Sequence, residues 1–150
     1  VEFFWDANTD HIWLLEVNPR ISESHADLFR KVDGASHHEI AADLSLGARP
    51  RLPHRDGEFP YAGKFFIRAY RDAIVQAVPG PEQLAEIERL MPDTIVRITV
   101  EPGQRLSQMM DQDSYSYTLA LLWIGAASPS KLQKRYEQAV EILEFTLEPV

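Results

Sequence analysis

Two short stretches at the start of the chain alternate between apolar and polar positions. Residues 1–6 and residues 12–18 carry an apolar side chain at every odd position, and the polar sequence Ala-Asn-Thr-Asp separates them at 7–10. Apolar residues that recur with a period of two predict β-strands, and a polar turn between two such runs predicts a hairpin. We therefore expect the chain to open with a β-hairpin.

The side chains of this hairpin suggest a register. If residues whose numbers sum to eighteen face each other, Trp5 pairs with Trp13 and Phe3 pairs with Leu15. Apolar cross-strand pairs of this kind each contribute roughly 0.2–1 kcal/mol. We therefore predict this register for the hairpin.

The same register places acidic side chains together. Glu2 lies opposite Glu16, and Asn18 follows two residues later on the same face. Like charges directly opposite are destabilising, so we interpret the pair as ligands of a cation. Mg²⁺ prefers oxygen ligands, and the guanidinium of Arg20 suits phosphate. Alternatively, the glutamates are ordinary solvated charges on an exposed face, and spacing alone leaves both interpretations open.

The remainder of the chain predicts an α+β fold with a mostly antiparallel sheet, because strands and helices follow one another in the order strand, strand, helix twice after residue 60. Residues 48–60 contain three prolines and a glycine and form the best domain boundary, which divides the chain into 1–47, 48–60 and 61–150. Helices are predicted at 22–32, 36–47, 80–92 and 128–143, strands at 61–70, 74–78, 94–100 and 117–124, and an edge strand at 145–149.

The predicted strand at 61–70 has two different faces. Phe65 and Ile67 lie on one face, while Lys64, Phe66 and Arg68 lie on the other. We expect the hairpin and the first two helices to pack on the sheet that the second half of the chain forms.

Composition narrows the class of protein. The chain has 150 residues, of which 45% are hydrophobic and 25% charged, as in globular proteins. Its net charge of −8 argues against nucleic acid or an anionic membrane as the partner. It has no apolar run long enough to span a bilayer and no cysteine, which is consistent with a reducing, cytoplasmic location. Asp111 and Asp113 lack the rest of an EF-hand pattern, so we predict no calcium site there.

The segment LLEVNPRISESH, preceded by VEFFWD across a short turn, resembles the C-terminal half of an ATP-grasp domain, close to the biotin carboxylase and carbamoyl-phosphate synthetase branch. This resemblance implies that Glu2, Glu16 and Asn18 are ligands of the Mg²⁺ (or Mn²⁺) that bridges the phosphates of ATP. It implies that Glu16, Asn18 and Arg20 form the nucleotide-phosphate site. Arg20, the expected catalytic residue, would contact phosphate or the acyl phosphate formed from the substrate.

The resemblance also implies a fold and an activity. The fold is the end of an ATP-grasp lobe, a hairpin plus two helices, followed by a biotin carboxylase C-terminal-like domain with two helices. The implied activity is that of an ATP- and Mg²⁺-dependent ligase, which activates a small carboxylate as an acyl phosphate. ATP and the acid would bind through an N-terminal lobe that precedes Val1, so we expect the chain to be an inactive fragment. It carries no biotin attachment site, and a homodimer is one option for its assembly.

One departure from the biotin carboxylase pattern concerns the base that acts on bicarbonate. Biotin carboxylases place a glutamate, followed by histidine, four residues after the arginine, whereas this chain has Ser24 there, followed by His25 and preceded by Glu23. On a helix, one residue turns the side chain by about 100°. We therefore favour a carboxylate–amine or carboxylate–thiol ligase over bicarbonate activation, with a non-catalytic binding domain as a further alternative. Arg97 is the nearest counterpart of the strand arginine that serves carboxylation, although its spacing to the next glycine differs.

Overall fold

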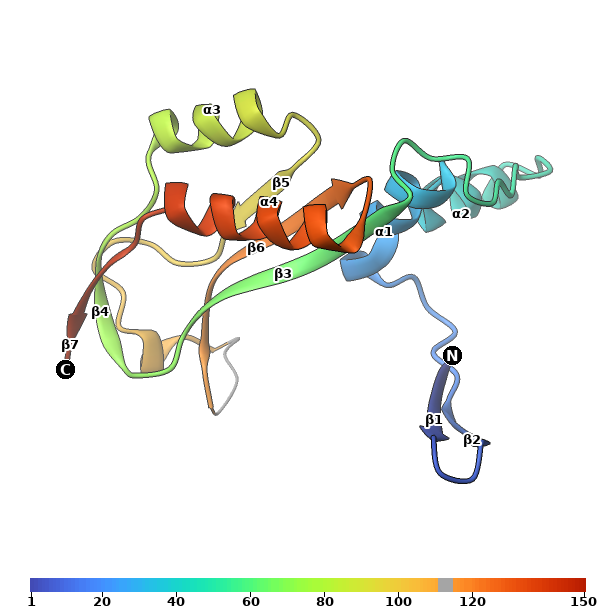
Figure 1. Ribbon diagram of the computed structural model, residues 1–150, viewed down its shortest axis with the longest axis horizontal. Coiled ribbons are helices and arrows are strands. Elements are labelled where there is room, and N and C mark those ends of the chain that lie inside the picture. The colour runs from blue at the N-terminus through green and yellow to red at the C-terminus, as the bar shows by residue number, and fades with distance from the viewer. Residues whose placement is uncertain (111–114) are drawn as a thin grey trace.

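The computed structural model describes residues 1–110 and 115–150, apart from the side chain of Glu23 (Figure 1). The elements follow the predicted order, and the described strands pair antiparallel throughout, as expected. In chain order they are β1 (Glu2–Asp6), β2 (His11–Glu16), α1 (Glu23–Asp33), α2 (His37–Ser45), β3 (Tyr61–Ala69), β4 (Ala73–Ala77), α3 (Pro81–Leu90), β5 (Ile95–Ile98), the 3-10 helix η1 (Leu106–Gln108), β6 (Tyr117–Ala126), α4 (Pro129–Ile142) and β7 (Thr146–Pro149).

Local signals fix the ends of the first two helices. Helix α1 ends at Gly34, whose φ of 93° lies in the left-handed region that glycine adopts at low cost. Helix α2 begins with a reciprocal pair of hydrogen bonds. The Glu39 N–H donates to the Ser36 hydroxyl (3.2 Å), and the Ser36 N–H donates to the Glu39 carboxylate (2.6 Å). Helix α1 therefore ends, and helix α2 begins, where the sequence predicts, whereas α2 ends at Ser45, before the predicted Gly47.

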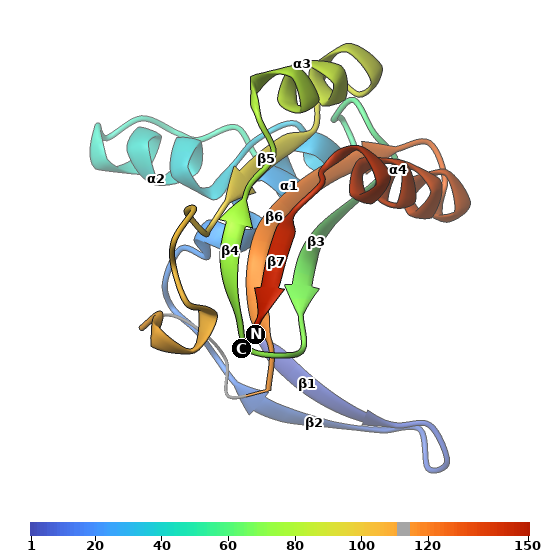
Figure 2. The ribbon, with the colours of Figure 1, turned by 90° about the vertical axis from the view of Figure 1, so that its left-hand side faces the viewer.

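Strand β6 is the centre of a three-stranded sheet with the order β3-β6-β5. Helices α3 and α4 cover one face of this sheet, where Leu122 and Ile124 of β6 are fully buried (Figure 2). Helix α1 covers part of the opposite face, and the Trp123 indole N–H there donates to the Ser24 carbonyl at 3.0 Å. The uncharged run of β6 is therefore buried on both sides from Leu122 to Ala126, whereas Leu121 is half-buried.

A second core lies beside the first. Strands β4 and β7 form a two-stranded sheet, which confirms the predicted edge strand at the C-terminal end. The register of β3 against β6 shifts between Ile67 and Arg68, so that Leu119 is the extra residue of a bulge. Leu119 is buried in the second core, together with Val75 and Leu106. The bulge thus allows β6 to contribute to two cores.

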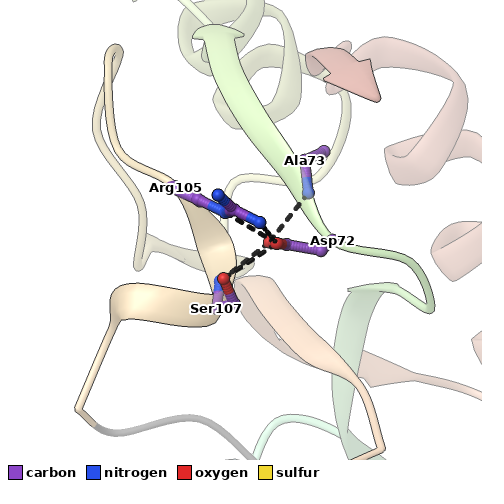
Figure 3. A network of polar contacts seen from close by, with 4 residues as sticks. All are labelled: Asp72, Ala73, Arg105 and Ser107. Atoms are coloured by element: carbon purple, nitrogen blue, oxygen red, sulfur yellow. Dashed lines mark hydrogen bonds and ion pairs between the residues drawn. The ribbon is translucent and has the colours of Figure 1, made fainter. Parts of the chain in front are cut away.

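Asp72 ties the second core together (Figure 3). Its Oδ1 accepts the backbone N–H groups of Ala73 and Ser107, each at 3.0 Å. Its Oδ2 accepts from Arg105 Nε at 2.7 Å and from the Ser107 hydroxyl at 2.8 Å. Partial burial alone would raise the pKa of Asp72, but the hydrogen bonds from Arg105 and Ser107 outweigh it and lower the pKa below 3.8.

The connector returns to α1 before β3 begins. Residues 46–60, all of them described, contain no helix or strand. The N–H groups of Gly57 and Phe59 donate to the carbonyls of Val32 and Lys31, each at 3.0 Å. A Cβ at Gly57 would lie 2.3 Å from the Lys31 carbonyl oxygen, so only glycine fits there. The division into 1–47, 48–60 and 61–150 remains a prediction.

The hairpin differs from expectation in its position. Strands β1 and β2 form their own two-stranded sheet, which extends away from the rest of the protein (Figures 1 and 2). The expectation that it packs on the second-half sheet is therefore wrong, whereas α1 does pack there and carries α2 beside it. Among the described strands, β1 pairs only with β2, so the hairpin satisfies its backbone hydrogen bonds within itself and adds no strand to that sheet.

Truncation of Leu122 tests the central position of β6. Leu122→Ala should lower the free energy of unfolding by about 3 kcal/mol, because it opens a cavity between β6 and its covering helices. The same truncation at Leu46, which is 83% exposed, should cost less than about 0.5 kcal/mol. Urea denaturation followed by circular dichroism measures both variants. Equal losses at the two positions would contradict this account of the core.

The Asp72 network predicts a pH dependence of stability. Because the folded pKa lies below the ordinary value of 3.8, the carboxylate stabilises the fold above that pH, and this contribution is lost as the pH falls through the folded pKa. Asp72→Asn should lower the melting temperature at pH 7, and the difference from wild type should shrink below pH 3.8. Thermal melts across this range measure it. A difference independent of pH would mean that charge is not what Asp72 contributes.

Candidate functional site

The turn of the hairpin sets a register that differs from the predicted one. The Asp6 carboxylate accepts the Asn8 N–H and the Thr9 hydroxyl, each at 2.9 Å, and these bonds lower the pKa of Asp6. Asp10 adopts a left-handed φ of 52° and accepts the Trp5 indole N–H at 3.1 Å. This chemistry closes a four-residue turn between Asp6 and His11.

The predicted aromatic pairs are therefore wrong. Trp5 lies opposite Ile12 instead of Trp13, and Phe3 lies opposite Leu14 instead of Leu15. The Phe4 and Trp13 rings, which do pair, have centroids 5.8 Å apart. Each residue of β1 therefore pairs with a β2 residue one position earlier than the side-chain pattern predicts. The hydrogen bonds of the Asp6 carboxylate cause this shift, because they select the length of the turn.

The acidic pair nevertheless forms as predicted. The register shifts between Glu2 and Phe3, where Leu15 is the extra residue of a bulge, and Glu2 then lies opposite Glu16. Cross-strand partners in an antiparallel pair place their side chains on the same face. A bulge next to functional groups is a common way to re-aim a side chain. Here it brings the two exposed carboxylates to one end of the ribbon.

Asn18 joins this pair directly. Its amide nitrogen donates to Glu16 Oε1 at 2.7 Å. The bond engages the amide nitrogen, which does not ligate cations, so the oxygen of Asn18 is the atom suited to a metal. Two carboxylates and one amide oxygen form a hard oxygen donor set, which fits Mg²⁺. Arg20 is exposed on the extended segment that leaves β2 and precedes α1.

Two absences concern the residues that the structure describes. Among these residues, no group of three or more His, Cys, Asp or Glu could by itself hold a metal ion. No helix in the same part of the chain is long and apolar enough to cross a membrane. Asp111 and Asp113, for which we predicted no calcium site, lie outside the described residues.

Polar side chains at the start of α1 form their own cluster. The Ser22 hydroxyl lies 2.7 Å from His25 Nδ1, and the Ser24 hydroxyl lies 3.1 Å from that of Ser22 and 3.3 Å from the same ring nitrogen. Ser24 holds the position where the biotin carboxylase pattern requires a glutamate. In this chain the hydroxyl at that position belongs to a serine–histidine cluster instead of a carboxylate. The structure does not describe the side chain of the neighbouring Glu23.

Sequence reasoning passed over Arg68. The part of the three-stranded sheet that α1 leaves uncovered is hollowed into a cavity of about 800 Å³. Arg68 of β3 and Arg97 of β5 both line it, as do Thr118 and Leu121 of β6. The signal was present in the alternation of residues 61–70, which places Arg68 on the face opposite the apolar one. Arg97, the arginine that we singled out, therefore shares a cavity with a second one.

Comparisons with known proteins bear on the fold. No protein-family model and no curated protein matches the chain. Among solved structures, the chain is similar to the biotin carboxylase domain dimer of Hydrogenobacter thermophilus 2-oxoglutarate carboxylase, in complex with MgADP, ADP and bicarbonate. The TM-score is 0.62 and the identity 16%, and the match covers 97% of this chain and 31% of that chain.

The match confirms the fold that the resemblance implied. The chain has the fold of part of a biotin carboxylase domain, with antiparallel sheets and four helices among the described residues. It spans about a third of the neighbour's length. At 16% identity the likeness concerns the fold, and activity, substrates and partners are matters for proposal.

Repulsion between the paired glutamates is testable without any metal. Glu2→Gln should slow amide hydrogen exchange in the hairpin, because it removes one of two like charges that face each other. The effect should fade in concentrated salt, which screens exposed charges within a few ångström. Exchange measured by NMR at low and high salt checks both points. A Glu2→Gln hairpin that exchanges as fast as wild type would contradict the pairing.

Proposed function

We propose that this chain contributes the metal- and phosphate-binding strands of an ATP- and Mg²⁺-dependent ligase of the ATP-grasp type. One observation carries the proposal: Glu2 lies opposite Glu16 and Asn18 bonds to Glu16, in a chain with a biotin carboxylase-like fold. A like-charge pair on an exposed ribbon is unfavourable unless something compensates it. A divalent cation is the compensation that suits these oxygen atoms.

Each residue has a separate role in this proposal. Glu2, Glu16 and Asn18 hold Mg²⁺, which when bound neutralises charge on the transferring phosphoryl group. The hydrogen bond from Asn18 fixes the orientation of the Glu16 carboxylate and so prepares it as a ligand. The guanidinium of Arg20 contacts phosphate and stabilises the negative charge of the acyl phosphate.

The reaction has two steps. A substrate carboxylate oxygen attacks the γ-phosphorus of ATP, which forms an acyl phosphate and releases ADP. An amine or thiol then attacks the acyl carbon, loses its proton, and expels inorganic phosphate. We favour this carboxylate ligase because a serine, bonded within its own cluster, holds the position of the bicarbonate base. Bicarbonate activation is the second candidate, since the structural neighbour is complexed with bicarbonate.

The exposure of the hairpin bears on whether the chain acts alone. Large apolar side chains on both of its faces are exposed, and an isolated two-stranded ribbon is only marginally stable in water. We propose that the chain is inactive alone and works within a longer cytoplasmic protein that covers the hairpin and supplies the nucleotide site. We include a homodimer, because the neighbour is a dimer.

Paramagnetic Mn²⁺ tests the metal site, because it occupies the same oxygen donor sets as Mg²⁺. Mn²⁺ added with ADP to the longer protein should broaden the amide signals of Glu16 and Asn18 selectively. Glu16→Gln should weaken this effect at least about tenfold, as the loss of a ligand does. Glu88→Gln, the same change at an exposed site on α3, is the matched control. Uniform broadening, or broadening that survives Glu16→Gln, would contradict the metal assignment.

The longer protein tests the activity. Its ATP-dependent phosphate release should require a carboxylate and an amine or thiol, and Glu16→Gln should reduce the rate by at least about a hundredfold, because the metal supplies several kcal/mol of charge stabilisation. Release supported by bicarbonate alone would favour the second candidate. No ATP turnover with any acid, together with no effect of Glu16→Gln on nucleotide binding, would indicate a non-catalytic binding domain.

A further inference from the structure

The connector contains a basic segment that the proposed function does not use. Residues 49–55 read Arg-Pro-Arg-Leu-Pro-His-Arg, with two prolines three positions apart and an arginine two positions after the second. No acidic residue occurs between Asp43 and Asp56, although the chain carries a net charge of −8. The segment therefore combines a regular proline spacing with a local charge that is opposite in sign to that of the whole chain.

Local backbone rules favour a polyproline II conformation in this segment. The ring of a proline fixes its own φ at about −65° and disfavours the helical region for the residue before it. Pro50 and Pro53, together with Arg49 and Leu52 before them, are therefore restricted to extended backbone. The structure agrees, because residues 48–53, all of them described, form no helix, strand or turn.

Both ends of the segment are attached to the folded part of the chain. Before it, the Ala48 N–H donates to the Asp43 carbonyl of α2 at 2.9 Å. After it, the Arg55 N–H donates to the carboxylate of Asp33, the last residue of α1, at 2.8 Å. Arg55 has a left-handed φ of 53°, so the extended backbone ends there. The two helices thus hold the segment in place, which lowers the ordering cost of binding a partner.

The exposed part of the segment places an apolar side chain between two charges. A polyproline II helix has three residues per turn, so side chains three positions apart share an edge. Arg49 and Leu52 share an edge that is exposed, and Leu52 is 71% exposed. Pro50 and Pro53 form the neighbouring edge and are half-buried, and Arg55 is exposed at the bend that ends the segment. One partner surface can therefore contact the leucine, the prolines and an arginine together.

Two of the three arginines are available to a charged partner. Arg51 forms an exposed ion pair with the Asp56 carboxylate. Among the described residues, the guanidinium groups of Arg49 and Arg55 have no ion-pair partner. A guanidinium binds a carboxylate through two parallel hydrogen bonds. The complementary surface is therefore an apolar groove with carboxylates beside it.

We propose that residues 49–55 bind an SH3-type domain, a small domain whose groove is lined by aromatic side chains and flanked by carboxylates. Grooves of this kind recognise prolines at the spacing found here, because the extended segment is ordered before it binds. Leu52 and the two prolines contact the aromatic side chains, and Arg55 contacts the carboxylates next to them. This surface uses neither the hairpin nor Mg²⁺, so it goes beyond the proposed function.

The leucine and the prolines distinguish this partner from a nucleic acid or a membrane. Nucleic acids and anionic lipids attract Lys and Arg through phosphate charge, and that attraction requires no proline spacing. In residues 49–55 the arginines are interleaved with an exposed leucine and two prolines. The pattern therefore favours a groove that accepts apolar side chains, with charge fixing the orientation of the segment.

The experiment is a calorimetric titration of the 150-residue chain with the isolated SH3 domain of a Src-family tyrosine kinase. NMR of the isotope-labelled SH3 domain should show shifts confined to its aromatic groove. Pro53→Ala, Leu52→Ala and Arg55→Gln should each raise Kd at least about tenfold, because each removes a contacted group. Arg55→Lys should give an intermediate Kd, because it keeps the charge and loses the planar fork.

Matched substitutions elsewhere on the surface control for changes in size and charge. Leu46→Ala, at a leucine that is 83% exposed, and Arg71→Gln, at an exposed arginine before β4, should leave Kd unchanged. Circular dichroism should show that all variants keep the fold, because residues 49–55 contribute no side chain to either described core. Leu52→Ala keeps the test valid if Pro53→Ala disturbs the connector.

Three results would overturn the proposal. The first is a titration with neither heat of binding nor shifts in the groove. The second is binding that Arg55→Gln abolishes and Leu52→Ala leaves unchanged, which would indicate a purely electrostatic contact. The third is equally tight binding to single-stranded DNA or to vesicles that contain anionic lipid. Glu16→Gln should leave Kd unchanged, so failure of this surface and failure of the metal site are distinguishable.

Discussion

Burial of β6 on both faces is the constraint on which the rest of the described structure depends. Its apolar side chains alternate between the helices α3 and α4 on one side and α1 on the other. The bulge at Leu119 then extends the same strand into a second core. Strand β6 also anchors α1, because the Trp123 indole donates to the Ser24 carbonyl. The connector is anchored in turn by its hydrogen bonds to α1. The cavity beside Arg68 takes its position from the sheet that β6 centres and from the part of it that α1 leaves uncovered.

The acidic pair of the hairpin and the cavity beside Arg68 rest on different kinds of structure. The acidic pair of the hairpin lies on an exposed ribbon that makes its own two-stranded sheet, so its geometry depends on a turn and a bulge alone. The cavity at Arg68 and Arg97 lies on the packed sheet, where a buried serine and a neighbouring aromatic ring position the charge. The first site therefore needs further protein to become rigid, whereas the position of Arg68 is set by contacts within this chain.

Local sequence signals predicted the elements well, because each depends on a few neighbouring residues. The start of α2 depends on Ser36 and Glu39, and the end of α1 depends on Gly34, so each signal lies within one turn of helix. The alternation of residues 61–70 likewise lies within the single strand β3. The hairpin register depended on the hydrogen bonds of Asp6, which periodicity does not encode. Glu2 still lies opposite Glu16, because the bulge at Leu15 shifts the pairing by one residue and so returns it to the predicted register. Arg68 was missed because its cavity arises from which part of a sheet a helix leaves uncovered, a property of the assembled fold.

The three tryptophans divide between two environments, and this gives the molecule a built-in optical reporter. Trp5 and Trp13 on the hairpin are 60% and 45% exposed, whereas Trp123 on β6 is 7% exposed. An indole in water emits fluorescence at longer wavelength than one enclosed by hydrocarbon. The long-wavelength side of the emission therefore reports on Trp5 and Trp13 in the hairpin, and the short-wavelength side reports on Trp123 in the core. Quenching by iodide should reach the first population and spare the second. Docking of the ribbon onto other protein would therefore register as a blue shift in the spectrum of the unlabelled chain.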